Sequence, residues 1–154
     1  MELGKACISD IGLLKKLRVE FLTEDKGYLS PDEINKIQEQ LGGYFQQHIP
    51  VGSFIGIIAE KDNQVLAVAF LSIFERPANP SFITGKIDTI SNVFTYPEFR
   101  RKGIATKLIN RIIDEAKQCN VSKIELYATN NGRYLYEKIG FYESSYTAMA
   151  LEIK

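Results

Sequence analysis

A short cationic loop is the part of this sequence best suited to chemistry. Residues 92–105 read NVFTYPEFRRKGIA, so a strand-like segment passes through Arg100, Arg101, Lys102 and Gly103 into an amphipathic segment. The first amides of a helix have no internal acceptors, and the helix dipole favours negative charge there. Because glycine also lets an anion approach the backbone, the loop indicates a phosphate or pyrophosphate site. A solvated turn would carry the same residues, and spacing alone leaves that alternative open.

Composition and missing motifs exclude several other classes of protein. The patterns GxxxxGK[ST] and GxGxxG are absent, which disfavours a P-loop nucleotidase and a Rossmann dinucleotide site. Lys and Arg number 19 and Asp and Glu number 19, so the basic excess of a nucleic-acid binder is missing. No apolar run approaches the ~20 residues of a membrane helix, and the N-terminus lacks a signal-peptide pattern. We therefore expect a cytoplasmic protein with neither nucleic acid nor membrane as a partner.

The metal-binding residue types are scarce. The chain has two cysteines, Cys7 and Cys119, without a CxxC motif, and a single histidine, His48. This set predicts no metal site. Cys119 lies at a predicted helix end and suits packing.

The elements that must position the loop follow from hydrophobic periodicity. Helical spacing predicts helices from Ser9 or Asp10 to about Asp25, and over 31–47, 104–118 and 132–139. Alternation and β-branched residues predict strands over 3–8, 53–61, 64–75, 86–94, 123–128 and 147–153. The length of 154 residues fits one domain. The order predicts an α/β fold with a mixed sheet and helices on its faces.

Two motifs in these elements resemble the GCN5-related N-acetyltransferases, the GNAT superfamily. The stretch Arg100–Ala105 fits the family's R/Q-x-x-G-x-G/A motif, and Leu135–Phe141 is close to its LYEKxGF motif. The resemblance implies a single domain over residues 1–154. It also implies a GNAT-like mixed, mostly antiparallel sheet of six to seven strands, with about four helices and splayed central strands.

The resemblance assigns roles to particular residues. Tyr136 would protonate the departing thiolate of coenzyme A, a task that a phenol can perform. The backbone of Val93, Phe94 and Thr95 would pair with the pantetheine arm along a splayed strand edge. Thr129 stands where many relatives have an asparagine that helps to hold coenzyme A. The pyrophosphate would be held by the loop and helix start, namely Arg100, Arg101, Lys102, Gly103, Ile104 and Ala105.

The implied activity is transfer of an acetyl group from acetyl-CoA, a co-substrate, to an amine by direct attack in a ternary complex. We expect a small-molecule amine as acceptor, with a protein amine as the alternative, and a homodimer is left open. Two rival functions also remain open. One is transfer from another acyl-CoA, and the other is an acyl-CoA-binding module without catalysis.

The general base and the acceptor pocket have no clear sequence signal. The positions at which relatives carry a glutamate base hold Ile124 and Thr89, and the nearby Asp88 should face the opposite side of its strand. Glu20 and Glu24 are candidate bases, and His48 is a weaker one. Residues that could line a pocket are Arg18, Glu20, Phe21, Tyr28, Tyr44 and Phe45, although aromatics at helical spacing are more often core.

Overall fold

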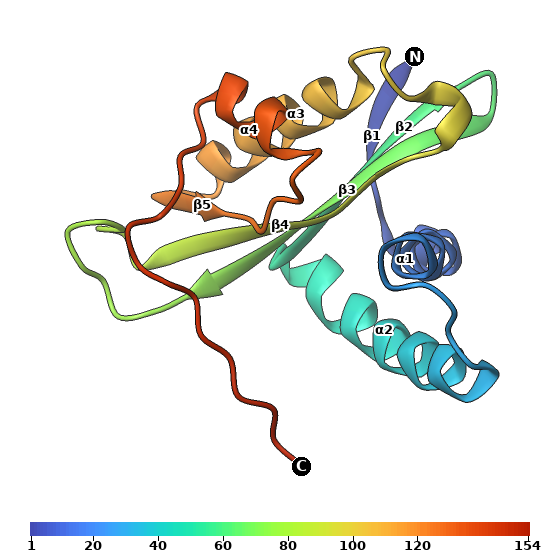
Figure 1. The fold of residues 1–154 in the computed structure, drawn as a ribbon, viewed down its shortest axis with the longest axis horizontal. Coiled ribbons are helices and arrows are strands. Elements are labelled where there is room, and N and C mark those ends of the chain that lie inside the picture. The colour runs from blue at the N-terminus through green and yellow to red at the C-terminus, as the bar shows by residue number, and fades with distance from the viewer.

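One mixed sheet organises the computed structural model, which describes all residues from Met1 to Lys154. The strand order is β1-β2-β3-β4-β5, antiparallel except for the parallel pair β4 and β5. Helices α1 and α2 cover one face, and α3 and α4 cover the other (Figure 1). The strands are β1 (Glu2–Lys5), β2 (Phe54–Lys61), β3 (Gln64–Glu75), β4 (Lys86–Thr95) and β5 (Lys123–Glu125). The α-helices are α1 (Ile11–Lys26), α2 (Pro31–Val51), α3 (Ile104–Gln118) and α4 (Arg133–Ile139).

Local signals set the element ends. Ser30 begins α2, because its side chain accepts a bond from the Glu33 amide while the Glu33 carboxylate accepts one from the Ser30 amide. Asp62 and Asn63 both have positive φ, 52° and 61°, which is the backbone of a tight hairpin between β2 and β3. Gly52 ends α2 in the left-handed conformation. Helix α2 therefore runs past the predicted end at Gln47 and includes Pro50 in its last turn.

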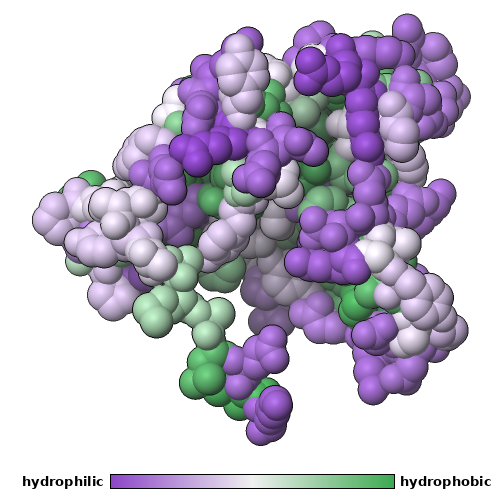
Figure 2. Space-filling model, viewed as in Figure 1, coloured by the Kyte–Doolittle hydropathy of each residue, from purple (hydrophilic) through white to green (hydrophobic).

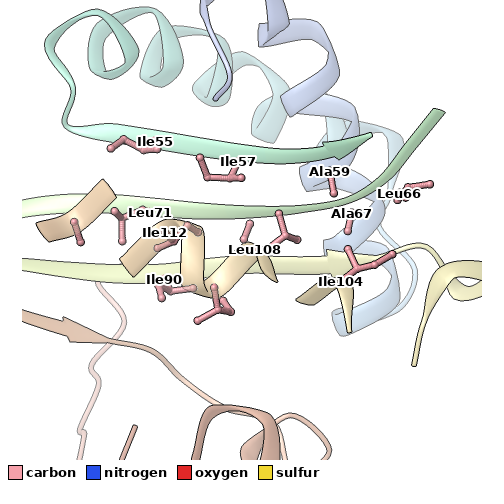
Figure 3. Packing of buried hydrophobic residues seen from close by; sticks show 13 residues of the cluster. Ile55, Ile57, Ala59, Leu66, Ala67, Leu71, Ile90, Ile104, Leu108 and Ile112 are labelled. Carbon is pink, nitrogen blue, oxygen red and sulfur yellow. The ribbon is translucent and has the colours of Figure 1, made fainter. Parts of the chain in front are cut away.

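The sheet separates two hydrophobic cores. On one side, Leu108, Ile109 and Ile112 of α3 are fully buried against the central strands, as Figure 3 shows for part of this cluster. On the other side, Leu14 and Phe45 anchor α1 and α2 to the opposite face. Strands β2 and β3 are covered on both faces, which explains their nearly continuous apolar sequences.

Strand β4 bends away from β5 and leaves part of its edge free. Opposite β3, Val68 pairs with Phe94 but Phe70 pairs with Ser91, so β4 carries one extra residue. Asn92 lies in this β-bulge with φ of 52°. Strand β5 contacts β4 only over residues 87–89. The outer edge of β4 beyond these residues has no strand partner, which confirms the predicted splaying.

The predicted strand count of six to seven is wrong, because the structure has five. Residues 147–153 alternate like a strand but find no neighbour for their backbone hydrogen bonds, and they form an extended tail instead. Met149, Leu151 and Ile153 are 93%, 86% and 88% exposed. Figure 2 shows apolar side chains on this projecting segment. Strand β5 also stops at Glu125, three residues before its predicted end, and β1 is shorter than predicted.

No helix is long and apolar enough to cross a membrane. No group of three or more His, Cys, Asp or Glu side chains is arranged to hold a metal ion. Cys7 is exposed and Cys119 is half-buried, and both are free thiols.

Candidate active site

The loop before α3 presents its backbone amides outward. Arg101 and Gly103 adopt left-handed backbone conformations, with φ of 64° and 75°. The amides of Arg101, Lys102 and Gly103 donate to no backbone carbonyl. A Cβ atom at Gly103 would meet nothing within 4 Å, so the space in front of the helix start is open. These amides and the first turn of α3 form a concave set of donors that can bind an anion.

The three cations of this loop have different surroundings. Arg100 donates to both carboxylate oxygens of Glu24, at 2.6 and 2.7 Å, and to the carbonyl of Thr95 at 2.8 Å. Lys102 donates to a carbonyl of the preceding turn at 3.1 Å. Arg101 makes no ion pair and is exposed. Arg100 therefore holds the loop against α1, whereas Arg101 and Lys102 form no ion pair and keep their charge for an incoming anion.

The predicted pantetheine-binding residues lie on the free edge of β4. Phe94 and Thr95 pair with β3 through the other edge of the strand. The Phe94 side chain is buried under α1 and α2, whereas Val93 packs on the α3 side. Ile104 is also buried and Ala105 is half-buried. For these residues the backbone is the part placed to bind a ligand.

Tyr136 lies on α4 with its ring edge-on to Phe141, at 5.9 Å between centroids. The hydroxyls of Tyr44 and Tyr96 are hydrogen-bonded to other side chains, whereas the Tyr136 hydroxyl has no side-chain partner. Burial alone acts on the pKa of Tyr136, and it raises that pKa. The phenol is therefore protonated at neutral pH and free to donate. Thr129 precedes this helix, and its hydroxyl accepts a bond from the Gly132 amide at 3.2 Å. Its position supports the start of α4.

Across the sheet lie two adjoining cavities, one of about 180 Å³ between α1, α2 and the strands and one of about 440 Å³ between α1 and α2. Arg18, Gln40 and Leu41 line both of them. The smaller cavity reaches the sheet at Ser72 of β3 and Ser91 of β4. Strand β4 thus contributes to both regions. Its free edge lies beside α3, and its Ser91 side chain lines the cavity on the α1 and α2 face.

Arg18 is the charged side chain common to both cavities. It donates to the Oδ1 atom of Asn92 at 3.3 Å, directly at the β4 bulge. Burial lowers the pKa of Arg18, and nearby Asp25 partly opposes that effect. Asn92 is itself 2% exposed, and its Nδ2 atom has no partner. The guanidinium therefore enters the cavity wall paired with a neutral amide.

The candidate bases lie outside these cavities. Glu20 accepts a bond from the Tyr96 hydroxyl at 2.5 Å. Burial, followed by the bond to Glu20, raises the pKa of Tyr96 to about 12. His48 is bonded through Nδ1 to the Ser53 hydroxyl at 2.6 Å near the end of α2. With Glu24 held by Arg100, no Asp, Glu or His side chain lines either cavity.

Asp88 faces the α3 side of β4, as its position in the strand predicts. Its cross-strand partners Ile73 and Ile124 pack against the α3 core, whereas Ser72, opposite Thr89, lines the cavity. Asp88 is 0% exposed and neither carboxyl oxygen has a hydrogen-bond partner. Burial raises its pKa to about 7, with Lys86 opposing. The carboxyl lies on the face opposite the cavity.

The sequence anticipated part of the cavity lining. Arg18, Tyr44 and Phe45 do line it, whereas Tyr28 is 85% exposed and Phe21 packs at the margin of the core. The polar lining residues of the smaller cavity that carried no sequence signal are Gln40, Ser72 and Ser91. They come from three separate elements, and each is an ordinary polar residue in its own segment.

A splayed sheet, an open helix start on one face and a cavity on the other define an acyltransferase-type fold. The chain belongs to the acetyltransferase (GNAT) family, whose model matches residues 16–141. No curated protein matches it significantly. Transfer of an acetyl group from acetyl-CoA is therefore the chemistry of its family.

Solved structures agree with this membership. A predicted acetyltransferase from Clostridium acetobutylicum, solved with acetyl-CoA, is 33% identical, with 99% of this chain and 95% of that chain covered and a TM-score of 0.85. A GCN5-related N-acetyltransferase from Ralstonia eutropha JMP134 is 24% identical, with 97% of each chain covered and a TM-score of 0.81. A ribosomal-protein-alanine N-acetyltransferase from Brucella melitensis biovar Abortus 2308 is 18% identical, with 99% and 100% covered and a TM-score of 0.73. The last two likenesses show the fold alone.

Proposed function

We propose that this protein transfers an acetyl group from acetyl-CoA to the primary amine of a small molecule by direct attack in a ternary complex. The observation that carries the proposal is the position of β4 between two sites. Its free edge adjoins the open start of α3, and its residue Ser91 lines the cavity on the α1 and α2 face. A donor and an acceptor could therefore approach the same strand from opposite faces.

The residues beside β4 fit acetyl-CoA. The outward amides of Arg101, Lys102 and Gly103 would hold the pyrophosphate, with Arg101 supplying charge. The backbone of residues 93–95 would bind the pantetheine arm as an added strand does. When bound, the co-substrate supplies the activated thioester. The clear space at Gly103 and the missing strand partner at β4 are the structural features that support this fit.

The proton steps follow from which side chains are present. Tyr136 is proposed to hold the proton that the leaving thiolate takes up, since its hydroxyl has no competing partner and its pKa is raised by burial. Thr129 is proposed to bind coenzyme A through the hydrogen of its hydroxyl, while its oxygen supports α4. No carboxylate or imidazole lines the cavities, so the acceptor ammonium loses one proton to water before attack. The nitrogen loses its second proton as the amide forms, and that proton restores the Tyr136 phenol through water.

Thiol release tests the proposal. The protein is mixed with acetyl-CoA and a panel of primary amines, and free coenzyme A is measured against samples lacking amine or protein. We expect amine-dependent release and an acetylated product of the expected mass. Acetyl-CoA binding without release for any amine would favour the non-catalytic binder. Faster turnover with propionyl-CoA or succinyl-CoA would favour a different acyl donor.

The remaining expectations concern partners and location. A homodimer is supported by the exposed apolar tail, because Met149, Leu151 and Ile153 are energetically costly to leave in water. The cytoplasmic location, the absence of nucleic-acid and membrane partners, and the choice of a small molecule over a protein amine all stay predictions.

A further inference from the structure

Arg18 occupies a position that transfer to an amine does not by itself explain. The acceptor in such a reaction arrives as an ammonium ion, and a cavity that favours a simple amine should contain acids. Arg18 lines both cavities and Lys36 lines the larger one, and no acidic side chain lines either. Asp25 near Arg18 and Asp32 beside Lys36 reduce this positive charge from outside the lining, but the lining itself offers an ammonium group no acid to pair with.

The charges of Lys36 and Arg18 are neutralised to different degrees. Lys36 pairs with Asp32 at 2.9 Å, and its side chain is 75% exposed, so solvent screens it. Arg18 is half-buried and forms no salt bridge, and its bond goes to the neutral Asn92 amide. A guanidinium carries five N–H donors in a planar fork. Most of these donors are therefore available to a ligand in the cavity.

The remaining lining of the smaller cavity combines an apolar part, from Leu41, Phe45, Phe54 and Phe70, with a few polar side chains. Tyr44 and Ser72 are hydrogen-bonded to each other at 3.0 Å, and Gln40 lies beside them in the wall. The Arg18 partner Asn92 lies in the β4 bulge, directly before the proposed donor-binding residues 93–95. A group bound by Arg18 is thus held near the strand at which the acetyl group would be presented. This placement suits an acceptor with a short spacer between its two functional groups.

We infer that the acceptor bears an anionic group, a carboxylate or a phosphate, that binds Arg18 while its amine faces β4. The inference rests on the proposed function and specifies its substrate class. Paired N–H donors of a guanidinium match the two oxygens of a carboxylate or phosphate. The anion also offsets the ammonium charge of the arriving substrate, so the zwitterion enters a cationic cavity without net repulsion. Arg18 thereby sets specificity.

Four small amines of similar length test the preference. They are β-alanine with a carboxylate, 2-aminoethyl phosphate with a phosphate, neutral ethanolamine, and 1,3-diaminopropane with a second ammonium. With acetyl-CoA saturating, we expect at least one anionic amine to exceed ethanolamine in kcat/KM by about tenfold or more, as for a charge-assisted bond. We expect 1,3-diaminopropane to be the poorest. The two anionic compounds distinguish a carboxylate site from a phosphate site.

A matched pair of variants assigns the preference to one residue. Arg18→Gln should lower the ratio of kcat/KM for the better anionic amine over ethanolamine by about tenfold or more, mainly through KM. Arg76→Gln removes the same charge from an exposed position outside both cavities and should keep the ratio. The acetyl-CoA-dependent rise in melting temperature, measured on both variants, checks that each is folded.

Calorimetry separates failure of this inference from failure of the proposed function. β-Alanine and 2-aminoethyl phosphate are titrated into the protein with coenzyme A present, and binding to wild type but not to Arg18→Gln supports the anion site even without turnover. Turnover of ethanolamine as efficient as that of both anionic amines would overturn the inference and leave the transferase standing. An unchanged ratio in Arg18→Gln, or no binding and no turnover of either anionic compound, would also overturn it.

Discussion

The two sides of β4 differ in how their residues are distributed along the chain. The proposed donor site is nearly continuous, with residues 93–105 supplying a strand edge, a loop and a helix start. The cavity proposed to bind the acceptor draws Arg18, Gln40, Ser72 and Ser91 from four separate elements. The donor side therefore carries a readable motif, and the acceptor side does not.

The cause of this difference is the kind of group that each side offers. Backbone amides are present whatever the side chains are, and a glycine at a helix start is enough to leave them open to an anion. Side chains in a cavity can be exchanged one at a time as the acceptor changes, so no spacing rule survives. Gly103, with φ of 75° and free space before it, exposes backbone donors, whereas Arg18 is an exchangeable cavity side chain.

The largest effect is expected for Tyr136 on the donor side. Tyr136→Phe keeps the ring against Phe141 but removes the transferable proton, so kcat should fall by ~10²-fold or more. The deficit should shrink as pH rises through about 8.5, the ordinary pKa of a thiol, because the thiolate then leaves unprotonated. Measurement of kcat against pH for both proteins checks this prediction.

A neighbouring tyrosine provides the control for this variant. Tyr134 lies on the same helix and is 66% exposed, so Tyr134→Phe should leave kcat unchanged. Equal kcat for wild type and Tyr136→Phe over the whole pH range would assign the proton to solvent. The donor side would then contribute binding alone.

A slightly smaller effect is expected for binding at Gly103. Acetyl-CoA at about 100 times its Kd should stabilise the fold by ~2.7 kcal/mol, or roughly 5–10 °C in melting temperature for this size. Gly103→Glu places a carboxylate where the pyrophosphate is proposed to bind, and it should remove most of that shift. Gly103→Ala introduces the same strain of a side chain at positive φ but no charge, so this variant should keep more of the acetyl-CoA-dependent shift in melting temperature. A full shift in the Glu variant would remove the anion site from this loop.

A third prediction concerns stability on the α3 side. Asp88 has an ordinary pKa of 3.8 that burial raises to about 7, so folding takes up a proton between these values. Its neutral form is compatible with the core, and the contribution of Asp88 to stability should fall as pH rises from about 4 to 7. Asp88→Asn should flatten this fall and add about 2 kcal/mol to the free energy of unfolding at pH 8.

Chemical denaturation at several pH values measures this difference. Asp114→Asn changes an exposed acid of α3 and should alter the profile little. A lower stability of Asp88→Asn at pH 8 would mean that the carboxylate has a partner in solution.

The fold was predictable where short-range pattern and burial agree. The apolar stripe of α3 and the capping box at Ser30 gave correct helices, and Asp62 with Asn63 gave the β2–β3 turn. Residues 147–153 show the limit of that reasoning, because alternation supplies a suitable face but not a neighbouring strand. Pro50 did not end α2, since the left-handed Gly52 two residues later provides the end.

The candidate site was predictable to the same uneven degree. The loop at 100–105 and the free edge of β4 follow from the motif and the fold it implies. The pairing of Arg100 with Glu24 did not follow, because it joins residues 76 apart in the chain. The bulge at Asn92, which carries the bond to Arg18, also did not follow, because no local pattern indicates it.

Amide hydrogen exchange with and without acetyl-CoA tests the central claim most directly. If the co-substrate binds along the free edge of β4 and at the start of α3, amides in residues 93–95 and 101–105 should gain protection. Amide exchange at Gln40 and Tyr44, which line the α1 and α2 cavity, should change little until an acceptor is added. Protection confined to that cavity, with unchanged exchange at 93–95 and 101–105, would contradict the two-sided arrangement.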